Sequence, residues 1–157
     1  LSMMVCNNTI QLSTRGSCDV VDITSQVEKV LQESALRTGV VTIFVPGATA
    51  GITTIEYEPG CIKDLKDAFE RLVSENGYYA HNARWHDGNG FSHVRAALLG
   101  PSLQVPFSEG RLMTGTWQQI ILVDFDNRPR RREVIVQILG EGSTAKEADS
   151  SSSVDSA

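Results

Sequence analysis

The sequence has little positive charge and no long apolar run. Lys and Arg number 14 against 19 Asp and Glu, which gives a net charge of −5 and an isoelectric point near 5.1. This balance argues against a protein that holds nucleic acid mainly through its phosphates. No apolar stretch approaches the roughly 18 residues of a membrane-spanning helix, and residues 1–5 lack the pattern of a secretory signal. We therefore expect a cytoplasmic protein that binds neither nucleic acid nor a membrane.

Cysteine and the familiar signatures of catalysis are also scarce. The three cysteines, Cys6, Cys18 and Cys61, are scattered and odd in number, so they predict neither a disulfide framework nor a CxxC metal site. The glycine-rich fingerprints of dinucleotide-binding and phosphate-binding loops are absent. The GxSxG nucleophile elbow is absent too. These absences leave nucleotide-binding folds and serine hydrolases of that type without support.

The composition changes sharply near the C-terminal end. Residues 142–157 are rich in Ser, carry more acidic than basic side chains, and hold one aliphatic residue larger than Ala, Val154. Such a segment buries too little apolar surface to offset the entropy of ordering. We predict a disordered, Ser-rich acidic tail over 142–157 and a single domain over 3–141.

Hydrophobic patterns predict helices and strands in alternation, followed by three strands in a row. Apolar residues at helical spacing predict helices over 23–38, 62–73 and 94–99, the first opened by a capping box of Ser25 and Glu28 and ended by Gly39. Short apolar runs predict strands over 9–13, 40–45, 52–57, 103–107, 112–126 and 131–139. Three consecutive strands favour antiparallel meander pairing, so we expect an α+β fold.

All three histidines fall in one segment that also holds a turn. His81, His86 and His93 flank the sequence Asp87-Gly-Asn-Gly90, which must turn the chain and can bring two or three imidazoles together. Histidine is the commonest metal ligand, and Asp87 or Glu56 would add a carboxylate. The sequence thus predicts a site for a divalent metal, Zn or Mg. The alternative, in which these are surface or capping histidines, stays open at this point.

Three further groups of polar residues each allow two interpretations. Glu56 lies on an otherwise apolar strand and is either exposed to solvent or an acid, base or metal ligand. The run Arg128-Pro-Arg-Arg-Arg132 suits phosphate oxygens or protects the end of a hairpin, and alternation places Arg130 and Arg132 on one face. The segment 110–119 either lines a polar pocket with Thr114, Thr116, Trp117 and Gln118 or buries Trp117 in the core.

Several motifs together resemble a known family. The matching residues are Thr53-Thr-Ile-Glu-Tyr-Glu-Pro-Gly60, Trp85-His-Asp-Gly-Asn-Gly90, Ser92-His-Val-Arg95, Leu98-Leu-Gly-Pro-Ser102, Gly110-Arg-Leu112 and Gly115-Thr-Trp-Gln-Gln119. They are similar to the YjbQ family, the uncharacterised UPF0047 group that is often labelled secondary thiamine-phosphate synthase. The similarity extends from about residue 9 to residue 141.

The resemblance implies a sandwich-like α+β domain, with mainly antiparallel sheets and helices packed on them, that assembles as a homotrimer. It implies an inter-subunit site in which a divalent metal and a small phosphorylated substrate meet. Carried onto this sequence, the catalytic residues would be Glu56, His81, Asp87 and His93, and the metal ligands His81, His86 and His93. The substrate-binding residues would be Asn89, Arg111, Thr116, Trp117 and Gln118.

Two positions depart from the family pattern. Many relatives have a histidine in the loop where this chain reads Pro46-Gly-Ala-Thr49, and close relatives often have a histidine where this chain has Phe91. Both departures make a histidine-rich site smaller in this chain.

The implied reaction joins an aminopyrimidine methyl diphosphate to a thiazole phosphate and releases diphosphate. It requires a metal or basic side chains at the leaving group, for which Arg111, Arg95 and the run 128–132 are candidates, and a surface for the pyrimidine, for which Trp117 is a candidate. Two alternatives remain. One is a metal-dependent hydrolase of a small phosphorylated compound, and the other is a non-catalytic trimer that binds a metal or a small ligand.

Overall fold

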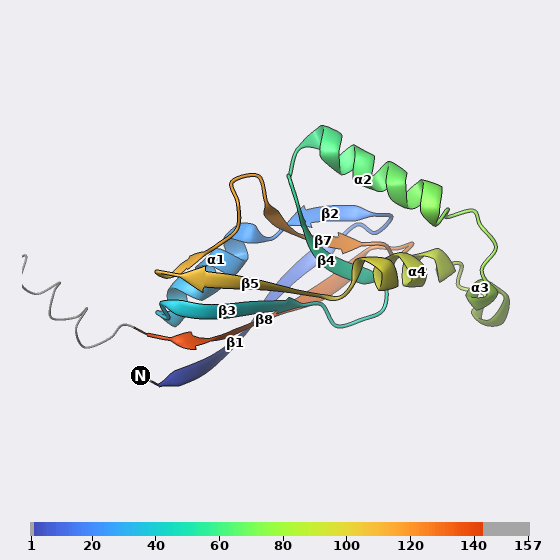
Figure 1. Ribbon diagram of the computed structural model, residues 1–157. Helices are drawn as coiled ribbons and strands as arrows, with labels where there is room; N and C mark the ends of the chain where they lie inside the picture. Colours follow the sequence, from blue (N-terminus) through green and yellow to red (C-terminus); the bar gives the residue numbers. More distant parts are fainter. Residues whose placement is uncertain (1, 143–157) are drawn as a thin grey trace, which may run out of the picture.

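The computed structural model describes residues 2–142 and contains two antiparallel β-sheets with helices packed on them (Figure 1). The larger sheet has the strand order β1-β8-β3-β5-β6, and the smaller has the order β2-β7-β4. The strands of the larger sheet are β1 (Met3–Thr14), β3 (Thr38–Phe44), β5 (Ser102–Ser108), β6 (Arg111–Leu112) and β8 (Arg130–Glu141). Those of the smaller sheet are β2 (Asp19–Asp22), β4 (Ala50–Ile55) and β7 (Gln119–Asp124). The α+β class predicted from the sequence is confirmed.

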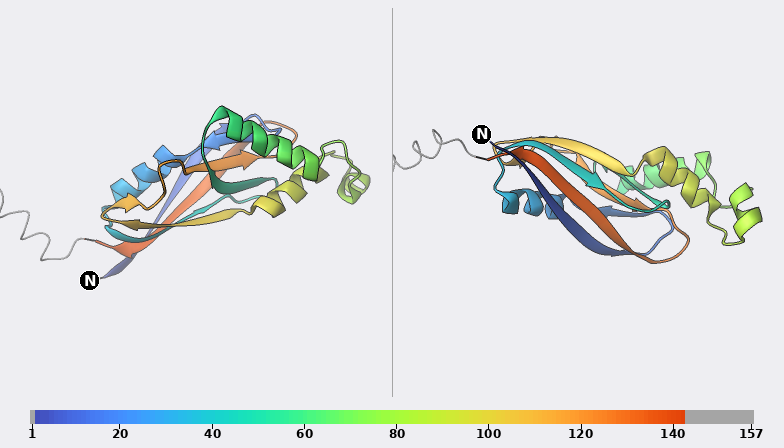
Figure 2. Two further views of the ribbon diagram at one scale, coloured as in Figure 1. Left: turned by 45° about the horizontal axis from the view of Figure 1, so that its top comes forward. Right: turned by 90° about the horizontal axis from the view of Figure 1, so that it is seen from below.

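The smaller sheet lies in the middle of the molecule. One of its faces packs against the larger sheet, where Ile52, Ile120 and Leu122 share a core with Val136 and Ile138. Its other face packs Ile121 and Val123 against Phe69 and Ala96. Phe69 belongs to α2 (Pro59–Leu72) and Ala96 to α4 (Gly90–Leu99). Figure 2 shows that no helix of residues 2–142 covers the outer face of the larger sheet.

The composition of β7 explains why this strand lies in the interior of the protein. Its central residues are the apolar run Ile120–Val123, and all four side chains are fully buried. Such a run is typical of a strand covered on both faces. Burial of four aliphatic side chains stabilises the fold by roughly 1.5–3 kcal/mol each. The central position of β7 therefore fixes the two carboxylates at its C-terminal end, Asp124 and Asp126, inside the protein.

The first helix, α1 (Thr24–Ser34), begins and ends differently from the sequence prediction. The predicted capping box at Ser25 is wrong, because Asp22 Oδ1 accepts hydrogen bonds from the backbone and hydroxyl of Thr24 at 2.9 and 2.6 Å. The helix ends when Ala35 adopts a left-handed conformation with φ of 58°. Gly39 lies in β3 instead, where a Cβ would collide with the backbone of Leu139. Close approach between β3 and β8 explains this glycine.

The C-terminal strands do not form the predicted meander. The segment predicted as one strand over 112–126 is divided between β6, in the larger sheet, and β7, in the smaller. Residues 113–118 form an irregular connection between them. β8 pairs with β1 and β3 rather than with β7. The pairing is antiparallel throughout the described strands, so the orientation was predicted correctly. Of the predicted neighbours, β5 and β6 do pair, whereas β7 and β8 do not.

The segment 78–91, in which the sequence predicted no helix or strand, contains the short helix α3 (Ala80–Trp85). A strand that the sequence did not predict, β2, precedes α1. No helix within residues 2–142 combines the length and apolar character that crossing a bilayer requires. The predicted disordered tail lies outside the described residues except for Gly142.

Candidate functional site

A cavity of about 500 Å³ opens at the end of the smaller sheet where β7 ends and β4 begins. We call it the histidine–arginine pocket. Three segments far apart in the sequence line it: the loop after β3, the α3–α4 region and the beginning of β8. The lining residues are Gly47, Ala48, Thr49, His81, Trp85, Asp87, Asn89, His93, Arg128, Arg130 and Arg132.

Two of the three histidines meet in this pocket. The ring of His81, on α3, lies 4.4 Å from the ring of His93, on α4, measured between centroids, with 39° between the ring planes. The Nδ1 atom of His81 is buried and makes no hydrogen bond with residues 2–142, although Asp87 Oδ1 lies 3.4 Å away. A buried nitrogen without a partner is costly to a fold, and such atoms concentrate at functional sites.

Burial and the neighbouring imidazole of His81 both lower the pKa of His93 from its usual value of 6.5, and together they outweigh the opposing charges of Asp87 and Asp126. His93 is therefore neutral at pH 7. A neutral imidazole offers a lone pair to a proton or a metal ion. The arrangement is suited to a base or a ligand and not to a permanent cation.

Asn89 lies between two carboxylates. Its side-chain amide donates to Asp126 Oδ1 at 3.4 Å, and turning the amide over lets it donate to both oxygens of Asp87 at 3.0 and 3.2 Å instead. Asn89 also precedes α4, and its carbonyl accepts the hydroxyl of the buried Ser92 at 2.6 Å. The amide of Asn89 thus has two orientations, one that binds the carboxylate next to the histidines and one that binds the buried carboxylate of Asp126.

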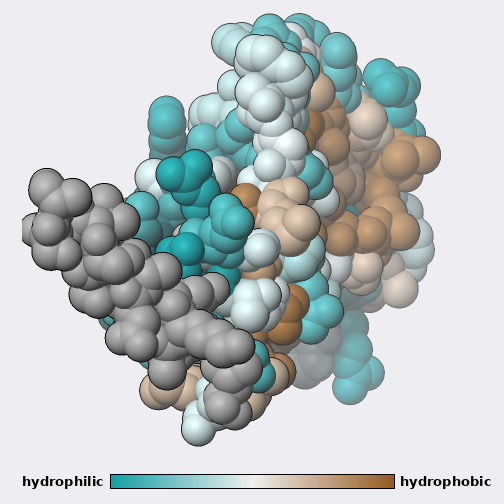
Figure 3. All heavy atoms as spheres, turned by 60° about the vertical axis from the view of Figure 1, so that its left-hand side comes forward, coloured by the Kyte–Doolittle hydropathy of each residue, from teal (hydrophilic) through white to brown (hydrophobic). Residues whose placement is uncertain are grey.

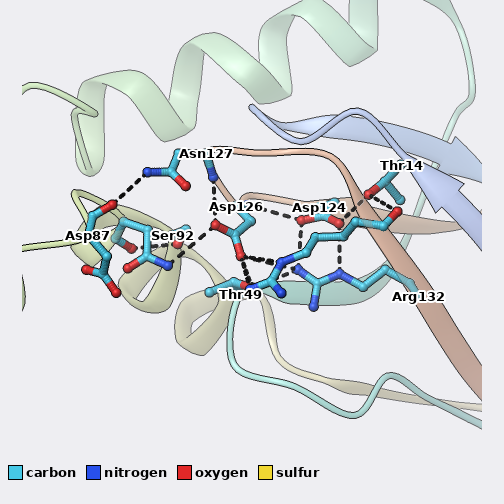
Figure 4. Close-up of polar contacts among 10 residues, drawn as sticks. Thr14, Thr49, Asp87, Ser92, Asp124, Asp126, Asn127 and Arg132 are labelled. Atoms are coloured by element: carbon cyan, nitrogen blue, oxygen red, sulfur yellow. Dashed lines mark hydrogen bonds and ion pairs between the residues drawn. The ribbon is translucent and has the colours of Figure 1, made fainter. Parts of the chain in front are cut away.

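Two buried aspartates hold two arginines at the back of the pocket (Figure 4). Arg132 binds both oxygens of Asp124 through Nε at 2.8 Å and Nη2 at 2.9 Å. Arg130 binds Asp126 Oδ2 through Nε at 2.9 Å and Nη2 at 2.7 Å. Thr49 donates to Asp126 at 3.0 Å and accepts from Arg132 at 2.7 Å, so it joins the two pairs.

Burial by itself raises the pKa of each aspartate, but the hydrogen bonds outweigh it and the pKa of both Asp124 and Asp126 is lowered from 3.8. For Asp124 the bonds come from Arg132 and Thr14. For Asp126 they come chiefly from Arg130 and the backbone of Asn127. Both carboxylates are therefore ionised at pH 7, and each guanidinium is fixed in orientation by its partner.

The remaining lining side chains are exposed. Arg128 makes no ion pair or side-chain hydrogen bond with any residue that the structure describes. Trp85 is 62% exposed, and the guanidinium of Arg84 lies 5.4 Å from its ring centroid. Arg128 and the free face of Trp85 are thus available to a ligand in the pocket.

Within one chain, the other predicted site residues lie elsewhere. Glu56 follows β4 at the opposite end of the smaller sheet, where it lines a second pocket with Thr116 and Trp117. β4 has six residues and spans about 20 Å at roughly 3.3 Å per residue. Trp117 is 73% exposed, so the interpretation that buried it in the core is wrong.

Gln118, Arg111 and His86 also lie away from the histidine pair. Gln118 donates to Thr54 at 3.2 Å, and Arg111 lines a third pocket beside α1. His86 follows α3 in a left-handed conformation, is exposed, and does not line the histidine–arginine pocket. The sequence therefore predicted a single site from residues that lie at three separate positions within one chain.

Arg95 is buried and has a structural role. It is 2% exposed, and it donates to Val73 O at 2.9 Å and to Glu70 at 2.9 Å. Its guanidinium lies over the ring of Phe91. This arginine connects α4 to the end of α2, so it is not available to a diphosphate.

The residues around the histidines fit a divalent metal in kind. A buried imidazole nitrogen without a hydrogen bond, a second neutral imidazole and a nearby carboxylate are the donor types that Zn²⁺ binds. As the side chains lie, no cluster of three His, Cys, Asp or Glu within residues 2–142 is arranged to hold a metal. His81, His93 and Asp87 would be the ligands, and the bound ion would polarise an oxygen of the substrate.

Comparison with known proteins agrees with this architecture. The model of the family described as "UPF0047 protein YjbQ-like" matches residues 8–141. This chain belongs to that family. A UPF0047 protein of Archaeoglobus fulgidus is 37% identical over 83% of this chain and 98% of its own length. The UPF0047 protein YugU of Bacillus subtilis is 34% identical over 84% and 98%.

Solved structures show the same fold. A YbjQ-like protein of unknown function from Sulfolobus solfataricus superposes with a TM-score of 0.85 at 36% identity, covering 89% of this chain and 100% of that one. A hypothetical protein from Aeropyrum pernix gives a TM-score of 0.80 at 31% identity, covering 86% and 98%. Neither description names a reaction.

Sequence reasoning missed the buried part of the site. Asp124 and Asp126 end the most apolar strand of the chain, and two carboxylates in such a run are an informative signal that an ionic network is buried there. Thr49 and Trp85 gave no comparable signal. Their place in the pocket depends on contacts between segments far apart in the sequence.

Proposed function

We propose that this protein of the UPF0047 family is an enzyme that acts on a small phosphorylated substrate in the histidine–arginine pocket. The observation that carries the proposal is the lining of one cavity of about 500 Å³ by a pair of imidazoles and three arginines. Binding sites of this size suit small molecules. Imidazoles and guanidiniums are the side chains best suited to proton transfer and to phosphate oxygens.

The specific reaction proposed is the formation of thiamine phosphate. The thiazole nitrogen attacks the methylene carbon of an aminopyrimidine methyl diphosphate, a C–N bond forms, and the C–O bond breaks. Diphosphate leaves with the electron pair of that bond. The barrier falls when fixed positive groups face the oxygens on which charge develops. Arg128, Arg130 and Arg132 are the groups that face this pocket.

Trp85 and the two histidines have separate roles in this proposal. The exposed ring of Trp85 provides a surface on which the pyrimidine stacks. His81, His93 and Asp87 would hold a divalent metal, Zn or Mg, which would supply positive charge to the leaving diphosphate when bound. The lowered pKa of His93 supports this role, because a ligand must be deprotonated.

A homotrimer would account for the predicted residues that lie apart in one chain. Glu56, Trp117 and Gln118 are exposed, and an inter-subunit site would bring them to the histidine pair of a neighbouring copy. Large exposed apolar side chains such as Leu72 on α2 and Leu98 on α4 support an oligomer. Figure 3 shows that apolar surface gathers on the right of that view. Sedimentation velocity tests this, with an expected mass of three chains of 17.1 kDa each.

The test of the reaction compares two histidine variants of the full chain. Protein purified without a nickel column or chelator is analysed for metal content. It is then incubated with the two substrates, and thiamine phosphate is measured by mass spectrometry. His93→Ala removes a pocket imidazole, and His86→Ala is the matched control because His86 is exposed outside the pocket. We expect His93→Ala to lower the rate at least about 100-fold and His86→Ala to leave it within about twofold.

The outcomes separate the proposed synthase from a structural role for the histidines. Thiamine phosphate formation that depends on His93 and not on His86 supports the proposed enzyme. Loss of the folded trimer in His93→Ala supports a structural role for the histidines. A folded wild-type protein that binds metal but forms no thiamine phosphate contradicts the synthase assignment.

A further inference from the structure

The loop between β3 and β4 forms one part of the wall of the histidine–arginine pocket. Gly47, Ala48 and Thr49 all line the pocket. Their amide groups make no hydrogen bond with any residue that the structure describes, whereas the carbonyl of Thr49 accepts from Phe125 at 2.9 Å. Thr49 is only 4% exposed. An amide at so buried a residue requires a partner, because burying it unpaired is costly.

Arg132 reaches this loop from the back of the pocket. Its side chain is 9% exposed, and Asp124 and Thr49 engage Nε and Nη2. The third nitrogen, Nη1, makes no hydrogen bond with residues 2–142 and lies 3.2 Å from where a Cβ on Gly47 would be. Arg130 is held in the same way by Asp126, through Nε and Nη2. Each aspartate thus fixes a guanidinium and leaves one nitrogen free.

Gly47 is required at its position for two reasons. Its φ is +117°, a left-handed conformation that residues with a side chain rarely adopt. A side chain there would also crowd Arg132 Nη1. The glycine therefore keeps the guanidinium accessible beside the amides of the loop. Successive amides next to an arginine are the arrangement by which proteins bind phosphate oxygens.

We propose that the amides of Gly47–Thr49 with Arg130 and Arg132 form an oxyanion cradle for a phosphoryl group, which Arg128 closes from the solvent side. This inference rests on the proposed function and assigns the substrate's phosphate to the wall that the loop 47–49 and the arginines form. Asp124 and Asp126 neutralise two of the arginines, so the cradle binds through oriented donors more than through net charge. Such a site selects a compact phosphoryl group over the extended backbone of a nucleic acid.

The test is isothermal titration calorimetry of the full chain with inorganic phosphate and with diphosphate. Arg128→Gln removes the exposed guanidinium of the pocket. Arg131→Gln is the matched control, because Arg131 is also exposed and changes the charge equally but does not line the pocket. We expect Arg128→Gln to weaken diphosphate binding about tenfold, the effect of one charge-assisted hydrogen bond. Arg131→Gln should change it less than about twofold.

Gly47→Ala is a second variant that leaves every charge in place. It should also weaken phosphate binding about tenfold, and thermal unfolding checks that the variant remains folded. Equal weakening by Arg128→Gln and Arg131→Gln, or no binding of either anion to the wild type, overturns the cradle. Stronger binding of a ten-nucleotide single-stranded DNA than of diphosphate overturns the assignment to a small molecule.

His93→Ala separates this inference from the proposed function. Diphosphate binding that persists in His93→Ala, together with loss of thiamine phosphate formation, supports both. Diphosphate binding that depends on Arg128 in a wild-type protein without synthase activity supports the cradle and contradicts the synthase. Synthase activity without measurable binding of either anion contradicts the cradle alone.

Discussion

The two ends of the strand pair β4–β7 carry polar residues in opposite environments. At one end, Asp124 and Asp126 are fully buried and bind Arg132 and Arg130. At the other end, Glu56 is exposed, and its side chain makes no hydrogen bond or ion pair with residues 2–142. Both ends have an adjoining pocket. The difference shows that one end is rigidly organised before any ligand arrives, which is the property expected of a binding or catalytic site.

The reason for the difference lies in what covers each end. The C-terminal end of β7 comes directly after a fully buried apolar run. The strands β8 and β1 and the loop at Thr49 pack around this end. At the end near Glu56, β7 is preceded by the irregular segment 113–118, in which Trp117 is exposed. Buried charges must be paired, whereas exposed ones need no partner. The same strands therefore support a fixed network at one end only.

The largest expected effect comes from breaking the buried network. Asp124→Asn removes the charge that Arg132 binds and leaves the guanidinium buried without a counterion. We expect the free energy of unfolding to fall by about 3–5 kcal/mol, the cost of breaking a buried ion pair. Urea unfolding followed by circular dichroism measures it. Glu56→Gln is the matched variant at the other end, and equal losses in the two variants would remove the contrast between the ends.

Acidic pH should destabilise the same end of the β4–β7 pair, where Asp124 and Asp126 lie. The folded-state pKa of Asp124 and of Asp126 lies below the usual value of 3.8, so the unfolded chain binds more protons than the folded protein as the pH falls. The stability that these groups contribute is present above pH 3.8 and is lost as the pH falls through the folded-state pKa. Unfolding free energies measured between pH 6 and pH 2 should decline toward acid. The decline should be shallower in Asp124→Asn, and an unchanged slope would contradict the assignment.

A smaller effect is expected at the histidine pair. Burial and then the neighbouring His81 lower the pKa of His93. His81→Ala weakens both causes, so the pKa of His93 should rise toward 6.5. Titration of the His93 ring signals by NMR measures the shift. In the wild type the midpoint should lie below 6.5, and a midpoint above this value would show that Asp87 and Asp126 dominate instead.

The smallest effect is expected at the exposed end. Trp117→Ala changes a side chain that is 73% exposed, so the stability of the isolated chain should change by about 0.5 kcal/mol or less. Unfolding in urea at a protein concentration that keeps the chain monomeric measures this. A loss that appears only at higher concentration would place Trp117 in contact with another copy. A large loss in the monomer would show that Trp117 supports the fold.

Some local features could be predicted because a few neighbouring residues decide them. Alternation along 128–132 predicted that Arg130 and Arg132 share a face, and the structure buries Arg132 while Arg131 is exposed. The apolar spacing over 62–73 predicted α2, which spans Pro59–Leu72. Here Glu58 caps the helix by accepting hydrogen bonds from Gly60 and Cys61. The short range of these interactions explains why the sequence reveals them.

The sequence by itself determined the α+β class, most of the helices and strands, and the histidine-rich segment. Only the tertiary structure decided which polar residues meet. Thr14 reaches Asp124 across 110 positions of the chain, and the loop at Thr49 reaches Asp126 across 77. It also separated Glu56 from His81, because β4 lies between the two ends of the sheet. The physical reason is that a buried charge takes whichever partner the packed strands bring to it, and no local pattern records that choice.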